Sequence, residues 1–293
     1  MPDGTLLALG SALAFGAALV VTQRGLAHLR PLAGARISIL TTAALFWLPA
    51  PWAFDAQVLG SPALGIFAAV GLFFPLLVTL LTFEANRVMG PTIAGSLGSV
   101  APLLSLGAGV LVLHEALTPR LAGAALLVAL GVAALSFRRE AGARRWPKAM
   151  LALPLAAAAL RAAAQALTKI GLGLVPSPYT AALAGYTVSA LAVWLVALPG
   201  GRMADGPATP GARGRWRQGA PWFMAAGLLN GSAVLAMYGA LSRAPLTVVA
   251  PIVAAYPIGT IVFSLGLLRS EPPGARHIAA ALAIVAGMVL VLA

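Results

Sequence analysis

The chain has 293 residues, of which 60% are hydrophobic and 9% are charged, and its mean hydropathy is +0.95. This composition leaves too little polar surface for a soluble protein and indicates a polytopic membrane protein without a soluble domain. The formal charge of +12 is carried by basic residues in short gaps between apolar runs, which is typical of topology signals and lipid headgroup contacts and not of a nucleic-acid site. The absence of cysteine excludes disulfides and thiolate metal sites, and we expect no cofactor or metal.

Ten apolar runs follow one another along the chain, each bounded by charged residues, Pro or Gly. About 20 residues of helix cross a bilayer, and lipid offers the backbone no hydrogen-bond partners, so these runs predict helices. The first run is expected to be retained as a span, because no basic segment precedes it. The predicted spans are 4–22, 32–49, 62–83, 91–113, 117–137, 149–171, 179–198, 220–241, 245–268 and 275–292. The expected fold is therefore an all-α integral membrane protein with ten transmembrane helices.

Charged positions recur at a fixed interval in the two halves of the chain. The recurring pairs are Arg87 and Arg243, Glu115 and Glu271, and Arg120 and Arg276, each 156 positions apart. These pairs predict two repeats, 1–143 and 144–293, joined by a basic segment. Because each repeat would hold five spans, the second repeat enters the bilayer from the opposite face. Such inverted repeats are typical of transporters that bind their substrate between the two halves.

Lys and Arg residues are distributed unequally between the predicted loops. Three of them, Arg120, Lys169 and Arg243, lie on the face that follows even-numbered spans. Fourteen lie on the other face: Arg24, Arg30, Arg87, Arg138, Arg139, Arg144, Arg145, Lys148, Arg202, Arg213, Arg215, Arg217, Arg269 and Arg276. Since loops rich in basic residues stay in the cytoplasm, this bias predicts that both termini lie outside the cytoplasm.

Arg161 lies about midway along the sixth predicted span. A cation at that depth costs roughly 2.5–3.5 kcal/mol or more, so it must face protein or water. Gln165 and Thr168 follow at helical spacing on the same face, which predicts a polar stripe along a central cavity. Arginine holds a carboxylate through two parallel hydrogen bonds, so the stripe suggests an amino acid or another organic acid as substrate. The alternative is a structural arginine that is tied to backbone carbonyls or lies nearer the interface.

Helix-breaking residues lie at matching depth in the fourth and ninth predicted spans. They are Gly95, Gly98 and Pro102 in the fourth span, and Pro251 and Pro257 in the ninth. A proline removes a backbone donor and frees a carbonyl, so these spans can bend or expose polar backbone beside a cavity. They are candidate gates, and static kinks that serve packing are the alternative.

Aromatic and polar residues at comparable depth are candidate walls of a substrate pocket. They are Phe15, Phe74, Thr79, Ser99, Asn230, Tyr238 and Tyr256. A mostly apolar pocket with few polar groups would accept amphipathic solutes. Glu115 and Glu271 lie at span ends, where we expect a carboxylate to cap the following helix or to pair with a nearby arginine.

Two proline-to-glutamate intervals, Pro102 to Glu115 and Pro257 to Glu271, are each followed by an amphipathic turn and a helix of small residues. With the opening LLALGSALAFGAALVVTQ they resemble, over essentially the whole chain, the ten-helix exporters of the EamA type in the drug/metabolite transporter superfamily. The pattern is also similar to the YddG-like branch of amino-acid exporters, aromatic amino acids included. The resemblance implies export of small organic solutes across a bacterial inner membrane. One departure concerns the site, because the family usually has an aromatic residue where this chain has Arg161.

The sequence thus predicts a secondary transporter whose two halves move by alternating access, for which a monomer is sufficient. Its partners would be a small-molecule substrate and membrane lipid. A membrane channel or a non-transporting structural subunit is the alternative, although an inverted duplication within one chain favours rocking of two halves over a pore lined by several subunits. A membrane enzyme would need clustered acid, base or metal-binding residues, and seven scattered carboxylates with three isolated histidines do not provide them.

Overall fold

The structure, a computed structural model, describes residues 2–136, 147–196, 212–267 and 275–292. All regular structure in these residues is helical, which confirms the all-α part of the predicted fold. The α-helices are α1 (Pro2–Leu26), α2 (Pro31–Trp47), α3 (Ala50–Ala53), α4 (Ala63–Phe73), α5 (Leu76–Gly98), α6 (Ala101–Leu111), α7 (Pro119–Ser136), α8 (Ala152–Leu174), α9 (Pro178–Val196), α10 (Ala212–Arg243), α11 (Leu246–Val253), α12 (Tyr256–Leu267) and α13 (Ala275–Leu292). Two short 3-10 helices, Ala56–Gly60 and Lys148–Leu151, precede α4 and α8.

Prolines fix the beginnings of many of these helices. Pro31, Pro119 and Pro178 are the first residues of α2, α7 and α9, and Pro102 and Pro257 are the second residues of α6 and α12. Proline suits the first turn because the backbone N–H there has no acceptor within the helix, and its fixed φ is already helical. The sequence therefore determines where apolar runs begin as helices and where a run is divided in two.

Several helical segments are long and apolar enough to cross a membrane. Within the described residues these are Asp3–Leu26, Ala63–Thr82, Ala149–Leu174, Gly214–Arg243 and Leu246–Ser264, with shorter apolar helices at Pro31–Trp47, Ala101–Leu111, Pro119–Leu135 and Ile278–Val291. Large apolar side chains such as Leu72, Trp194 and Leu282 point outwards and are more than half exposed. A surface of this kind needs lipid around it. The protein is a multi-pass membrane protein.

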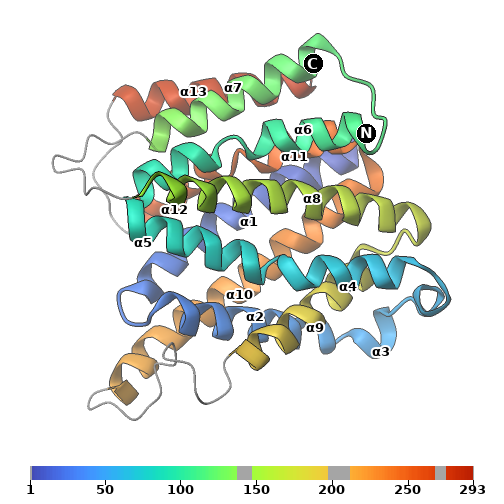
Figure 1. The fold of residues 1–293 in the computed structure, drawn as a ribbon, viewed down its shortest axis with the longest axis vertical. Helices are drawn as coiled ribbons and strands as arrows, with labels where there is room; N and C mark the ends of the chain where they lie inside the picture. The colour runs from blue at the N-terminus through green and yellow to red at the C-terminus, as the bar shows by residue number, and fades with distance from the viewer. Residues whose placement is uncertain (1, 137–146, 197–211, 268–274, 293) are drawn as a thin grey trace.

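Helices before and after the gap at 137–146 pack against one another and do not form two separate bundles. α1 lies along α10 and α12, and α8 lies along α4, α5 and α6. α2 packs against α9 and α10, and α7 packs against α13. Figure 1 shows the long helices running across the molecule, with both chain ends at the same end of the bundle. We call this the terminal end and the other the opposite end.

The contact between α7 and α13 is reciprocal. A methyl group at Gly131 in α7 would lie 2.9 Å from the carbonyl oxygen of Ala280, and one at Gly287 in α13 would lie 2.9 Å from that of Ala124. Small residues allow such close approach where lipid supplies no hydrophobic drive between helices. Gly131 and Gly287 are 156 positions apart, as are Ala124 and Ala280. The same pair of contacts therefore occurs twice, and the order of residues along the two helices makes them antiparallel.

α5 differs from the sequence-based prediction. The third and fourth spans were expected to end at 83 and to begin at 91, whereas α5 runs as one helix from Leu76 to Gly98. Its ends lie beside Pro75 and before Pro102, where helical hydrogen bonding is interrupted. The apolar span Ala63–Thr82 consequently crosses the break between α4 and α5.

Candidate functional site

A central cavity lies among α1, α2 and α5 to α12. It consists of two adjoining regions of about 250 Å³ and about 200 Å³. The residues that line both regions are Phe15, Leu19, Phe74, Thr82, Arg161 and Tyr256. The lining comes from helices on both sides of the gap at 137–146, so the cavity lies where the predicted repeats meet. Its volume suits a small solute, since pockets for drug-sized ligands occupy roughly 300–1,000 Å³.

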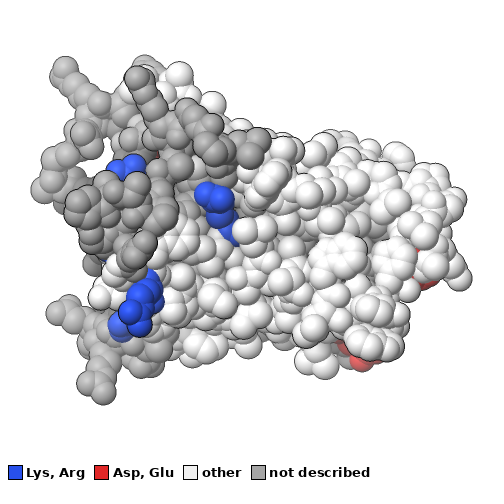
Figure 2. All heavy atoms as spheres, turned by 90° about the horizontal axis from the view of Figure 1, so that it is seen from below, with Lys and Arg blue, Asp and Glu red and all other residues white. Residues whose placement is uncertain are grey.

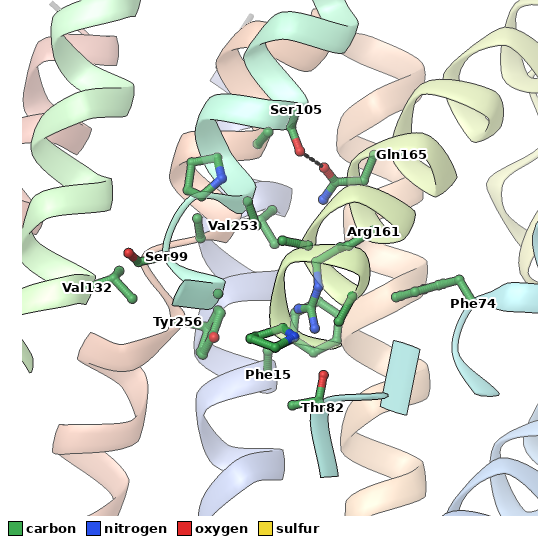
Figure 3. Close-up of a pocket in the computed structure, with 18 of the residues that line it drawn as sticks. Phe15, Phe74, Thr82, Ser99, Ser105, Val132, Arg161, Gln165, Val253 and Tyr256 are labelled. Carbon is green, nitrogen blue, oxygen red and sulfur yellow. Dashed lines mark hydrogen bonds between the residues drawn. The ribbon is translucent and has the colours of Figure 1, made fainter. Parts of the chain in front are cut away.

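Arg161 is the central polar group of this cavity. It lies in the middle of α8, is partly exposed, and lines both regions. Figure 3 shows its guanidinium extending towards Thr82 and Phe15. Within the described residues the guanidinium makes no hydrogen bond or ion pair with the protein. An arginine at mid-span without a protein partner leaves a cationic hydrogen-bond donor directed into the cavity, which is an environment that attracts an anion.

Gln165, one turn after Arg161, forms one wall of the cavity and is buried. Its Oε1 accepts a hydrogen bond from Ser105 Oγ at 2.7 Å, and its Nε2 lies 3.6 Å from Met237 Sδ (Figure 3). The amide thus links α8 to α6 and α10. Since both ends of the side chain are already engaged, Gln165 supports the cavity wall in this conformation and is less available to a solute than Arg161.

Lys169 lies one further turn along α8 towards the terminal end, directly after the buried Thr168. Its Nζ donates hydrogen bonds to the carbonyls of Leu241 at 2.5 Å and Ala244 at 2.8 Å, at the end of α10. These carbonyls are among the last of the helix and have no intrahelical donor. Arg161, Gln165 and Lys169 therefore lie on successive turns of α8. Arg161 faces the cavity, Gln165 forms its wall, and Lys169 hydrogen-bonds the end of α10.

Glu115, which follows α6, connects α6 to α11 at the terminal end of the bundle. Its Oε1 and Oε2 accept hydrogen bonds from the backbone N–H groups of Leu246 and Thr247, both at 2.7 Å. The first N–H groups of a helix have no intrahelical acceptor and form the positive end of its dipole, so a carboxylate is favourable there. The sequence had suggested that Glu115 caps the helix that follows it or pairs with a nearby arginine. Glu115 does cap a helix N-terminus, but the capped helix is α11 and not the following helix, α7.

Three helix interruptions border the cavity. They occur at Phe74–Pro75 between α4 and α5, at Ser99–Val100 between α5 and α6, and at Ala254–Ala255 between α11 and α12. Phe74, Pro75, Ser99 and Ala254 line the cavity. The breaks between α5 and α6 and between α11 and α12 are 155 positions apart and match the predicted breaks in the fourth and ninth spans. The break between α4 and α5 was not predicted.

The remaining predicted site residues fall into three groups. The cavity is lined by Phe15, Phe74, Thr79, Ser99, Asn230 and Tyr256, and also by Gly98 and Pro102. Three predicted residues are not among the described lining residues: Tyr238, Pro251 and Pro257. Tyr238 is buried, and Pro251 is buried within α11. The surroundings of Gly95 in α5 lie outside the described residues, as does Glu271.

Sequence reasoning missed several lining residues. Thr82 and Tyr186 line the cavity, as does Ser105, the partner of Gln165. Thr82 and Ala85 are three positions apart on α5 and share the face that meets the cavity. That spacing could have indicated Thr82, whereas the place of Tyr186 on α9 depends on packing between helices that are distant in the sequence.

Charge is separated between the two ends of the molecule. Figure 2 shows Lys and Arg side chains at one end and Asp and Glu side chains at the other. From the ends of their helices in Figure 1, Asp3, Asp55 and Glu115 lie at the terminal end, and Arg24, Arg30, Arg36, Arg215 and Arg217 lie at the opposite end. The basic residues at the terminal end hydrogen-bond helix carbonyls: Lys169 to Leu241 and Ala244, Arg120 to Leu290 and Val291, and Arg243 to Gly239. These three have a local role at helix C-termini, where a cation is favourable.

An all-helical, multi-pass bundle with a cavity lined from both parts of the chain defines a membrane protein of the transporter type. Comparison with known proteins agrees with this class. The model of the EamA-like transporter family matches residues 3–137 and again residues 148–293. The chain belongs to the EamA-like transporter family and contains two copies of its repeat.

Solved structures share the fold. Among 29 matching chains, one titled only "Crystal structure of protein" superposes with a TM-score of 0.75 over 99% of this chain and 96% of its own length, at 16% sequence identity. This identity is low enough that the likeness concerns the fold alone. No curated protein matches the chain.

Proposed function

We propose that the protein is a secondary transporter that exports small organic solutes carrying a carboxylate, the class that contains amino acids and related metabolites. The proposal depends on one observation: Arg161 is a mid-span cation that lines a cavity of about 250 Å³, and its guanidinium has no protein partner among the described residues. A carboxylate would accept two parallel charge-assisted hydrogen bonds from it and would neutralise a charge that is costly at this depth. Phe15, Phe74 and Tyr256 would contact the apolar part of the solute.

The proposed mechanism is alternating access between two inverted five-helix repeats, 1–143 and 144–293, with ten crossings in all. The reciprocal, antiparallel contact of α7 with α13 supports inversion, because a two-fold axis in the membrane plane generates such a pair of contacts. In Figure 1, α4 begins and α6 ends at the terminal end, so the chain returns to that end between them, which favours two crossings.

The breaks beside the cavity are the proposed gates. Gly98 and Pro102 border the break between α5 and α6, and Gly95 precedes it; Pro251 and Pro257 flank the break between α11 and α12. Helices interrupted beside a cavity can swing as short segments without breaking a full ladder of hydrogen bonds. At the terminal end, the hydrogen bonds made by Gln165, Lys169 and Glu115 would have to break for the cavity to open there.

The proposed setting is a bacterial inner membrane with both termini outside the cytoplasm. The charge separation supports this orientation, since the three basic residues at the terminal end serve as helix caps while those at the opposite end remain as topology signals. A reporter that is active only in the cytoplasm should stay inactive at the C-terminus, and activity there would reverse the orientation. A monomer is sufficient in this proposal, because one chain lines the whole cavity.

Counterflow in proteoliposomes tests the proposed function. Vesicles preloaded with an unlabelled carboxylate solute should accumulate the same labelled solute, and vesicles loaded with sugar phosphates or cationic drugs should not. Accumulation requires a site that alternates between the two faces, so a channel would equilibrate the label without a transient excess. Equal exchange of all three solute classes, or single-channel currents in a planar bilayer, would count against the proposal.

A further inference from the structure

We infer that this cavity prefers monocarboxylates without an ammonium group, with an aromatic or branched apolar body, over zwitterionic amino acids of the same carbon skeleton. The inference rests on the proposed function, because it assigns the substrate class of the same site. It depends on the charges and hydrogen-bond acceptors that the cavity offers.

The charge of the cavity is the first observation. Of the described residues that line it, only Arg161 is charged, and no carboxylate is among them. A bound monocarboxylate leaves this region electrically neutral. A zwitterion also satisfies Arg161 but brings a second cation for which no described lining residue supplies a carboxylate partner, and an unpaired charge in a largely apolar cavity is costly.

The carboxylates of the described residues lie elsewhere. Asp3 and Asp55 are at the terminal end, and Glu115 is engaged by the N-terminus of α11. Glu84 lies on α5, two positions after Thr82, and does not line the cavity. None of these carboxylates is among the described residues that line the cavity.

Backbone carbonyls at the helix breaks are the next candidates for binding an ammonium group. At the break between α4 and α5, the carbonyls of Gly71 and Phe74 accept hydrogen bonds from Ser189 Oγ, at 2.5 Å and 3.4 Å. At the break between α11 and α12, the carbonyl of Ile252 accepts one from the N–H of Ala255 at 3.1 Å. Carbonyls that already have donors are weaker ligands for a cation than free ones. The carbonyls of the lining residues Gly98 and Val253, four positions before Pro102 and Pro257, receive no helical N–H, but as neutral groups they bind a cation less strongly than a carboxylate does.

The remaining groups that could meet an ammonium are neutral. Thr82 Oγ1 already donates to the carbonyl of Val78, which leaves it an acceptor, and the rings of Phe15, Phe74 and Tyr256 could offer cation–π contacts. Such contacts contribute less binding free energy than a carboxylate partner would. A ring face that contacts the ammonium also cannot contact the apolar body of the solute. The cavity is therefore better matched to a solute whose only charge is its carboxylate.

Four probes with one benzyl skeleton test this inference. They are 3-phenylpropionate, phenylpyruvate, L-phenylalanine and phenethylamine, whose binding is measured by calorimetry on the purified full-length protein. Binding is preferred to flux here because protonated acids cross lipid without a carrier. We expect both monocarboxylates to bind at least about tenfold more tightly than L-phenylalanine, and phenethylamine not to bind. Phenylpyruvate and L-phenylalanine both carry a polar α-substituent, so their comparison controls for hydrophobicity.

The Arg161→Gln variant separates failure of the inference from failure of the proposed function. If L-phenylalanine binds as tightly as phenylpyruvate or more tightly, and Arg161→Gln abolishes that binding, the inference falls while the proposed function stands. If no carboxylate binds in a manner that depends on Arg161, both fall. Tighter binding of the two monocarboxylates that is lost in Arg161→Gln supports both.

Discussion

Replacing Arg161 with Gln is expected to abolish transport of carboxylate solutes while leaving the protein folded. The substitution removes two charge-assisted hydrogen bonds to the solute, which should weaken binding by roughly 10²- to 10³-fold. It also removes a mid-span charge without a protein partner among the described residues, so thermal stability without solute should be unchanged or higher. Solute should raise the unfolding temperature of the original protein and not that of the variant. Counterflow and thermal unfolding in detergent measure these effects.

Two further variants give this prediction its controls. Arg161→Lys keeps the charge and loses the planar pair of donors, so it should retain part of the transport activity. Arg243→Gln makes the same chemical change at an exposed residue whose guanidinium bonds the carbonyl of Gly239 in its own helix, and it should transport normally. Normal transport by Arg161→Gln would rule out the substrate role of Arg161, and loss of folded protein in that variant would show that the residue has a structural role.

Replacing Glu115 with Ala is expected to destabilise the terminal end of the bundle. The carboxylate accepts two backbone hydrogen bonds at the N-terminus of α11, and loss of such a cap costs about 2 kcal/mol. The apparent unfolding temperature should fall by roughly 4–8 °C. α11 leads into the break beside the cavity, so loss of its cap should change the relative populations of the two access states. Solute affinity should therefore change as well.

Asp55→Asn is the matched control for Glu115. Its Oδ1 accepts one hydrogen bond, from the N–H of Gln57 in an exposed turn at the same end of the molecule, and the amide oxygen of Asn can replace it. Gly109→Ala is a second test of the cap, since a methyl group there would lie 2.8 Å from Thr247 Cγ2 and 2.9 Å from Glu115 Oε2 and would push both sides of the cap apart. If Glu115→Ala and Gly109→Ala both unfold at the original temperature, the cap contributes no stability.

Much of this fold could be predicted from local features of the sequence. Apolar runs of about twenty residues predict helices because lipid leaves the backbone no other partners, and prolines such as Pro31 and Pro178 mark where helices begin. Arg161 was identifiable as a candidate because a cation at mid-span needs a partner. The breaks near Pro102 and Pro257 followed from the same local chemistry.

Contacts between distant parts of the chain could not be predicted in this way. Ser105 and Gln165 are 60 positions apart, and Glu115 lies 131 positions from Leu246, so no local pattern relates them. Tyr238 and Tyr186 have similar aromatic character and depth, yet only Tyr186 lines the cavity among the described residues. Which face of a buried helix meets the cavity depends on packing, because a helix that is apolar all round carries little directional signal.

The central claim is that a carboxylate solute binds in the cavity beside Arg161, and protection of a single cysteine tests it most directly. The chain has no native cysteine, so Thr82→Cys places one thiol at the cavity without any background. We predict that phenylpyruvate slows its reaction with neutral N-ethylmaleimide, and that this protection disappears when Arg161→Gln is added. Protection that is equal with and without Arg161, or reaction that the solute never slows although counterflow proceeds, would contradict the account.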